Sequence, residues 1–113
     1  MNLINLERKE EIYYLDERPL KLKNMNKDLI LGIRPEYLMI DDSSLLRMTI
    51  NYIEDHGSDK YLTGQLNDTS IVIKDSTETE YSIDQNIGIA VNWKKASYFD
   101  LESGKRVEGV VWN

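Results

Sequence analysis

The sequence predicts an all-β domain, built as a small barrel of roughly seven to nine short strands. Apolar residues alternate with polar ones along several stretches, turn-forming residues separate those stretches, and no long stretch has the apolar spacing of a helix. The chain has 113 residues, which is the size of one domain with one modest core. It contains no cysteine that could form a stabilising disulfide, which suits a barrel with few exposed sheet edges.

Two stretches carry the clearest alternation. The first has four apolar residues that we expect on the core-facing side of one strand: Leu46, Met48, Ile50 and Tyr52. The second covers residues 87–93, with isoleucine, valine and tryptophan on one face. Its other face carries the small residues Gly88 and Ala90, which indicates that a neighbour packs closely there.

Several shorter stretches have the pattern of hairpins and single strands. Residues 12–15 and 20–23 flank a proline turn at residues 16–19, and residues 60–66 form a strand in which Gly64 marks a bulge or bend. Residues 71–73 form a short β-branched strand. Residues 97–100 and 105–108 form a final hairpin, in which Gly104 supplies a positive φ. Near the C-terminus, Trp112 belongs either to a packed last strand or to an exposed patch.

The segment from Gly32 to Glu36 predicts where one strand stops. It follows the apolar run Leu29-Ile30-Leu31, and Pro35 has no backbone N–H with which to continue a sheet ladder. The proline also favours an extended conformation at Arg34. We expect at most one helical turn after it.

Composition excludes several classes of function. The net charge of −6 disfavours nucleic-acid binding, although Lys21, Lys23, Lys27 and Arg34 are candidates for a local basic patch. No apolar run is long enough to span a membrane, and charges appear too early for a signal peptide. A cytoplasmic protein is therefore expected.

The sequence also predicts that the chain is not an enzyme. It lacks the G-x-x-x-x-G-K-[ST] loop that holds nucleotide phosphates. Around its one Gly-Lys pair, Phe99 occupies the position of the motif's first glycine, and Arg106 occupies that of its serine or threonine. His56 is the single histidine and is either a general base oriented by Asp55 or Asp59, or, as we favour, a polar turn residue before Gly57. We expect no catalytic residue, no cofactor site and no metal site.

Three segments, in order, resemble one family of domains. Residues 31–38 (Leu-Gly-Ile-Arg-Pro-Glu-Tyr-Leu) resemble the strand that opens the main part of the C-terminal regulatory domain in ATP-binding subunits of bacterial sugar-import ABC transporters. Residues 53–61 are similar to that family's Val-Glu-x-Leu-Gly-x-Glu segment, with His56 in place of leucine and Asp59 in place of glutamate. Residues 97–106 resemble its closing Phe-Asp-x-x-x-Gly-x-Arg. In addition to these three segments, residues 1–4 resemble the stretch that follows the family's ATPase domain.

The resemblance implies a single TOBE domain (transport-associated, OB-like barrel) over residues 1–113, without the ATPase domain and without the Walker A and signature motifs. The chain would be an excised domain or a naturally short protein. Its role would be regulatory and dimer-forming, within an ABC importer whose transported solute, by the family resemblance, would be a sugar. ATP and Mg²⁺ would bind the missing ATPase domain of an ATP-hydrolysing parent subunit.

The resemblance also implies partners and candidate contact residues. The expected partners are a second ATP-binding subunit, the membrane permease subunits and, in some members, a regulatory protein, which together would hold the domain at the inner face of the membrane. Candidate regulatory or interface residues are Arg34, Glu36, Glu54, Gly57 and Phe99. Structural alternatives stay open: a turn at Gly57, core packing of Phe99, and an ion pair of Arg34 with Glu36 or a loop.

Two other functions remain as alternatives. One is a small-ligand sensor for an oxyanion or a sugar, in which Arg34, Lys60 and Arg106 would supply charge. The other is a single-stranded nucleic-acid-binding OB domain whose aromatic residues stack on bases, which the negative charge opposes.

Overall fold

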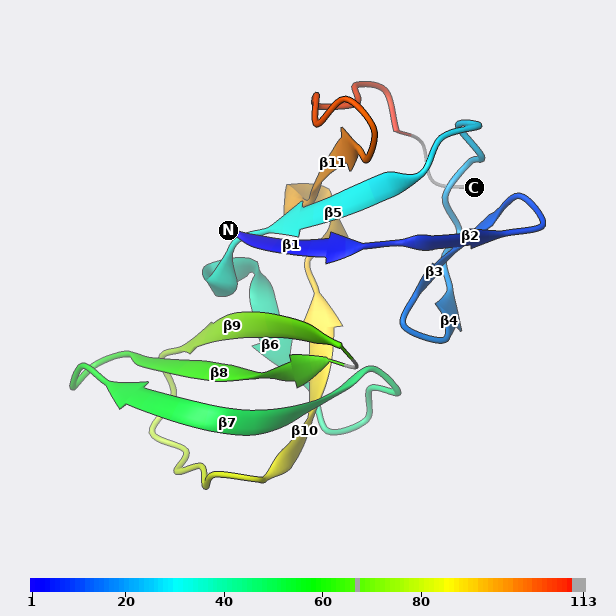
Figure 1. Ribbon diagram of the computed structural model, residues 1–113. Helices are drawn as coiled ribbons and strands as arrows, with labels where there is room; N and C mark the ends of the chain where they lie inside the picture. Colours follow the sequence, from blue (N-terminus) through cyan, green and yellow to red (C-terminus); the bar gives the residue numbers. More distant parts are fainter. Residues whose placement is uncertain (67, 111–113) are drawn as a thin grey trace.

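The protein is almost entirely β-structure, arranged in three antiparallel sheets (Figure 1). The computed structural model describes residues 1–66 and 68–110, so Trp112 lies outside the described residues. The strands are β1 (Asn2–Asn5), β2 (Glu7–Lys9), β3 (Ile12–Leu15), β4 (Arg18–Pro19), β5 (Leu29–Ile33), β6 (Leu38–Ile40), β7 (Arg47–Asp55), β8 (Lys60–Leu66), β9 (Thr69–Asp75), β10 (Asn86–Val91) and β11 (Ser97–Asp100). Two single 3-10 turns, η1 (Pro35–Tyr37) and η2 (Trp93–Lys95), are the helical elements of the described chain.

The all-β prediction with an OB-like fold is confirmed, although the strands outnumber the expected seven to nine. The difference comes from short strands with little periodicity of their own, such as β1, β2 and β6. Each is held by a neighbour far away in sequence or by a tight turn, which hydrophobic spacing does not reveal. No helix within the described residues is long and apolar enough to cross a membrane.

The largest sheet has five strands in the order β6-β10-β7-β8-β9. It curls so that η1 and β6 contact the far edge strand β9, which closes an OB-like barrel (Figure 1). Its interior is filled by side chains that are fully buried, among them Met48, Ile50, Leu62, Ile73 and Ile87.

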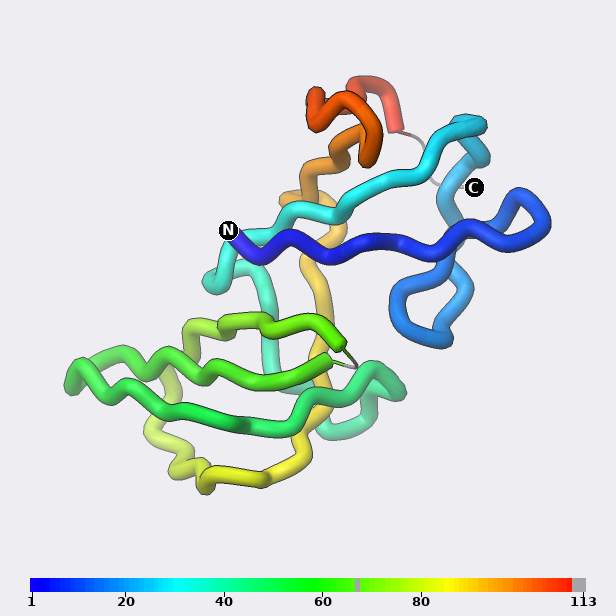
Figure 2. The backbone as a smooth tube through the Cα atoms, viewed as in Figure 1, coloured from blue at the N-terminus to red at the C-terminus, as the bar shows by residue number. Residues whose placement is uncertain are grey.

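A three-stranded sheet, β1-β5-β11, packs over this barrel. In its register Ile4 lies opposite Leu31, and Leu31 lies opposite Tyr98. These side chains are buried in the same core as those of the barrel. The chain trace shows that β1 begins beside the end of β5, as the antiparallel register requires (Figure 2).

The third sheet, β2-β3-β4, forms an arm at one end of the molecule, and the β7–β8 hairpin forms the other end (Figure 1). The hairpin predicted around residues 16–19 exists, but its turn is shorter than expected. Leu15 pairs with Arg18 and Tyr14 with Pro19, so Asp16 and Glu17 alone make the turn. Pro19 is tolerated in β4 because an edge strand does not need its missing N–H.

The predicted inward position of Tyr52 is wrong. Leu46, Met48 and Ile50 are buried as expected, but Tyr52 is 59% exposed. The pairing with β8 shifts between Ile50 and Tyr52, so one extra residue enters β7 and turns the following side chains to the opposite face. The bulge lies on β7, opposite Gly64, rather than on Gly64 itself.

The predicted strands at residues 20–23 and 105–108 are wrong, because each segment makes only an isolated bridge, and Trp93 lies in η2 rather than in β10. The predictions for Pro35, Gly104 and Gly88 are confirmed. Pro35 ends β5 and starts the single turn η1, and Arg34 is extended with φ −75° and ψ 150°. Gly104 has φ +72° in the final hairpin, where Phe99 bridges to Arg106. A Cβ added at Gly88 would collide with the carbonyl oxygen of Asp41, which explains why that face of β10 carries a glycine.

Candidate functional site

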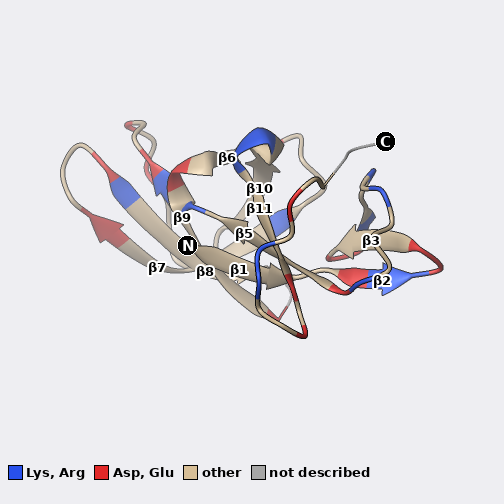
Figure 3. Ribbon diagram, turned by 90° about the horizontal axis from the view of Figure 1, so that it is seen from above, with Lys and Arg blue, Asp and Glu red and all other residues tan. Residues whose placement is uncertain are grey.

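The β7–β8 hairpin carries two of the five candidate residues, Glu54 and Gly57. Gly57 sits at the tip with φ +88°, and its N–H donates to Asp55 Oδ1 at 2.8 Å. Across the same turn, the N–H of His56 donates to the carbonyl oxygen of Asp59 at 2.8 Å. The turn interpretation of Gly57 is therefore confirmed. The end of β7 beside this turn carries acidic residues, drawn in red (Figure 3).

The side chain of His56 is oriented by Glu54 and not by either aspartate named in the sequence analysis. Its Nε2 lies 3.1 Å from Glu54 Oε1, and its ring meets the ring of Tyr61 edge-on at 5.4 Å between centroids. Both members of the polar pair are about half exposed. The pair therefore forms part of the exposed surface of the hairpin tip.

Phe99 lies on the outer face of the β1-β5-β11 sheet and is only partly buried. Its neighbour Tyr98 occupies the core, so the core-packing alternative for Phe99 does not hold. A Cβ added at Gly32 would lie 2.7 Å from both Phe99 Cε2 and Met1 Sδ. Gly32, from the family-like segment 31–38, thus leaves room for the aromatic ring of Phe99, from the segment 97–106.

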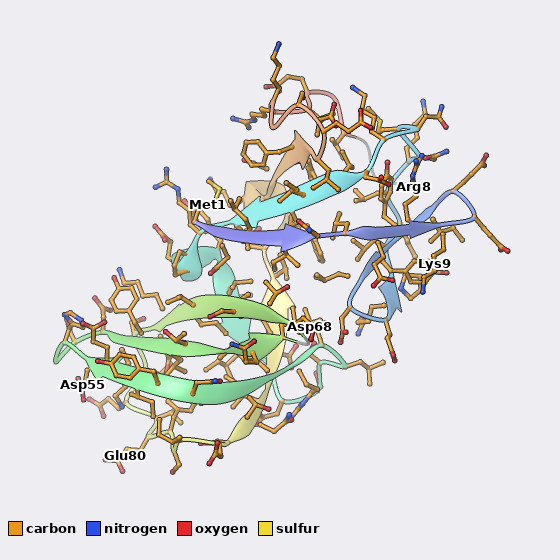
Figure 4. The ribbon with its side chains drawn as sticks, viewed as in Figure 1. Met1, Arg8, Lys9, Asp55, Asp68 and Glu80 are labelled. Atoms are coloured by element: carbon orange, nitrogen blue, oxygen red, sulfur yellow. The ribbon has the colours of Figure 1, made fainter. Side chains whose placement is uncertain are left out.

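This outer face forms what we call the outer apolar patch, made of Met1, Leu3, Ile30 and Phe99. Leu3 pairs with Gly32 and Ile30 with Phe99 across the sheet, so all four side chains gather on one side. Leu3 is 56% exposed, and Met1 lies at the open end of β1 (Figure 4). Apolar side chains gathered on one exposed face are typical of an interaction surface.

Arg34 and Glu36 flank Pro35 at the junction of β5 and η1, and both are exposed. Within residues 1–66 and 68–110 neither of them forms an ion pair, so the expected pairing is not found. Glu36 instead borders a groove of about 540 Å³ that runs between β6 and β9.

The groove also holds a polar cluster around the buried Asp75, which sequence reasoning missed. Asp75 ends β9 at 9% exposure, and it accepts hydrogen bonds from Thr77 Oγ1 at 2.7 Å and from Tyr81. Burial acts to raise the pKa of Asp75, but these hydrogen bonds and the charge of Lys60 outweigh it, and the pKa falls below its usual value. Asp-x-Thr after a β-branched run was the available indication of such a capped strand end.

The cations proposed for an oxyanion sensor occupy separate parts of the fold. Lys60 Nζ donates to the carbonyl oxygen of Thr79 at 2.7 Å, and Arg106 Nε lies 3.5 Å from Glu108 Oε1. Arg34 lies at the end of β5. In the part of the chain that the structure describes, no cluster of three histidine or acidic residues could hold a metal ion.

Comparison with known proteins gives two related sequences. The sn-glycerol-3-phosphate import ATP-binding protein UgpC of Ruegeria pomeroyi is 30% identical over 79 residues, which cover 68% of this chain and 22% of the relative. The protein of the same name from Cupriavidus metallidurans is 23% identical over 87 residues, which cover 75% of this chain and 24% of the relative. No family model matches the sequence.

The chain is related to ATP-binding subunits of ABC importers. The predicted resemblance is confirmed at this level, and a C-terminal domain of a sugar-type subunit is consistent with it. This importer-related chain spans about a quarter of the length of the relatives that it matches.

In this importer-related domain, the five candidate residues do not converge on one site. Glu54 and Gly57 lie at the tip of the β7–β8 hairpin, while Phe99 lies on the outer apolar patch. Arg34 and Glu36 lie at the end of β5 and in η1. The candidate residues therefore lie on three separate parts of the surface.

Proposed function

We propose that this chain is a non-catalytic regulatory and dimerisation domain of the ATP-binding subunit of an ABC importer. The observation that carries the proposal is the sequence relationship: most of this small all-β chain matches about a quarter of two importer ATP-binding proteins. A sugar-type solute is the class that the family resemblance favours. Under this proposal ATP and Mg²⁺ act on a separate ATPase domain.

The partners of the domain follow from the same proposal. A second ATP-binding subunit would be contacted through matching surfaces, because homodimers usually pair about a two-fold axis. Permease subunits would hold the complex at the cytoplasmic face of the membrane, and a regulatory protein would contact the exposed acidic tip of the β7–β8 hairpin. The outer apolar patch supports the dimer contact, because burying Leu3 and Met1 would remove exposed apolar surface from water.

Sedimentation equilibrium over a wide concentration range tests the dimer contact. We expect reversible self-association that Leu3→Asp weakens, since a carboxylate would enter an apolar interface. The matched control is Leu45→Asp, because Leu45 is also apolar, 78% exposed and outside the patch. A monomer at every concentration, or equal weakening by both variants, would contradict the proposed interface.

Calorimetry with Mg-ATP tests the non-catalytic assignment. We expect no binding heat, because the sequence has no glycine loop to hold phosphates. Specific nucleotide binding or hydrolysis by the purified chain would overturn this part of the proposal.

A further inference from the structure

A pocket of about 310 Å³ lies between the β3–β4 hairpin and the barrel, away from all five candidate residues. Its apolar lining includes Leu15, Leu46 and Ile89, which are buried members of the core. Trp93 in η2 borders the same space. The volume corresponds to roughly ten groups of the size of a water molecule, which is enough for a small organic molecule.

The charges around this pocket have one sign. Its charged lining residues are Arg18 and Lys21, and no carboxylate lines it, although the chain as a whole has 20 acidic and 14 basic residues. Both cations are exposed, and no described acidic side chain forms an ion pair with either one. A buried apolar lining with two exposed cations favours a ligand that has an apolar body and an anionic end.

The backbone of β10 runs along one side of the pocket, and its peptide groups alternate in direction. Ile89 N donates to the carbonyl oxygen of Leu46 at 2.9 Å, and Ile89 O accepts from Ser44 Oγ at 2.6 Å. Peptide groups point to alternate sides along an antiparallel strand, so the next groups on this side of β10 are those of Val91. Val91 lines the pocket, beyond the point where β7 begins.

We propose that this pocket binds a small amphipathic organic anion, with its carboxylate at Arg18 and Lys21 and its hydrocarbon part on Leu15, Leu46 and Ile89. The binding site is independent of the importer role proposed above, and it uses none of the cations considered for an inorganic oxyanion sensor. A small fragment in a half-open pocket of this size is expected to bind with a dissociation constant on the order of 1 mM.

The test is a nuclear magnetic resonance titration of the nitrogen-15-labelled chain with sodium hexanoate at low ionic strength. We expect saturable shifts at the backbone amides of Leu46 and Val91 and at the indole N–H of Trp93. Hexanol, hexylammonium and inorganic phosphate are the comparison ligands, since each lacks either the anionic or the apolar part. Added salt is expected to weaken hexanoate binding, because the two cations are exposed.

Variants separate the charge contribution from general effects. The double variant Arg18→Gln with Lys21→Gln is expected to lower hexanoate affinity about tenfold, which corresponds to the loss of two charge-assisted contacts. The matched control is Lys23→Gln with Lys105→Gln, which removes two exposed cations outside the pocket and should leave the affinity unchanged. Because all four positions are exposed, both proteins are expected to fold.

Three results would overturn the proposal. The first is the absence of saturable shifts with hexanoate. The second is equal affinity for hexanoate, hexanol and hexylammonium, which would remove the role of the cations. The third is phosphate binding at these residues as tight as that of hexanoate, which would remove the role of the apolar lining.

Discussion

The side-chain amide of Asn2 forms two hydrogen bonds with the backbone of Val72, 70 residues away. Asn2 Nδ2 donates to the carbonyl oxygen of Val72 at 2.8 Å, and the N–H of Val72 donates to Asn2 Oδ1 at 2.8 Å. Val72 belongs to β9, an edge strand of the barrel, and Asn2 is 6% exposed. The side chain of Asn2 thus takes the place of a neighbouring strand and joins the β1-β5-β11 sheet to the barrel.

Asn2→Ala is expected to lower the free energy of unfolding by about 2–3 kcal/mol, because it removes both bonds and leaves the peptide group of Val72 unsatisfied. Urea denaturation measures the loss. Asn5→Ala is the matched control, since Asn5 lies on the same strand with an exposed side chain and should cost little. Equal losses for the two variants would contradict the role given to Asn2.

Gly64→Ala tests the close approach of β7 and β8. An added Cβ would collide with the carbonyl oxygen of Thr49 and lie 2.5 Å from Met48 Cγ, so the two paired strands would have to separate. We expect a loss of about 3 kcal/mol in unfolding free energy.

Gly57→Ala is the comparison for Gly64→Ala. Its Cβ would meet no atom within 4 Å, and it would cost only the strain of a left-handed alanine at φ +88°, about 1 kcal/mol. Thermal unfolding of both variants checks the order, and a larger loss at Gly57 would contradict it.

Because of the bulge in β7, substitutions at Ile50 and Tyr52 should affect stability differently, although the alternating pattern predicts both side chains to be buried. Ile50→Ala should destabilise the protein by about 3 kcal/mol, because Ile50 is fully buried. Tyr52→Ser should change the stability by no more than about 0.5 kcal/mol, because the bulge turns Tyr52 to solvent. Similar losses by chemical denaturation would mean that the strand lacks this bulge in solution.

Asp75 should make the stability depend on acid pH. Its pKa is lowered in the folded protein, so its contribution is present above the pKa of the unfolded chain, about 3.9, and is lost as the pH falls through the folded pKa. The unfolding free energy of the wild type should therefore fall more steeply below pH 4–5, roughly, than that of Asp75→Asn, which has no carboxylate there to titrate.

The control for Asp75 is Asp55→Asn. Asp55 is an exposed carboxylate that also caps a turn, through its bond to Gly57 N, but lies at the hairpin tip. If Asp55→Asn altered the acid dependence as much as Asp75→Asn, the polar cluster around Asp75 would not be its source.

Local chemistry explains which parts of the fold were predictable. The bounds of β8 follow from alternation between two turn regions, and the end of β5 follows from the missing N–H of Pro35. Gly57 and Gly104 were predictable as turn residues because positive φ is a property of one residue and its neighbours.

The candidate site was less predictable than the fold. The family-like segments indicated Gly57 and Phe99, but their separation at the hairpin tip and the outer apolar patch required the register of the sheets. Asp75 was missed because its burial and its hydrogen bond from Tyr81 arise only when the chain after β9 folds back on it, while the local pair with Thr77 does not by itself reveal burial. The pocket beside Trp93 was also missed, because its lining comes from three separated parts of the sequence.

The sequence by itself determined the all-β class, the negative charge, the absence of a phosphate-binding loop and the ends of several strands. These properties depend on composition or on residues close together in the chain. Tertiary structure alone decided the bulge that exposes Tyr52, the hydrogen bonds between Asn2 and Val72, and the pocket lined by Arg18 and Trp93. The bulge depends on the register between β7 and β8, and the other two depend on the packing of separate sheets and loops, none of which follows from a periodic pattern in the sequence.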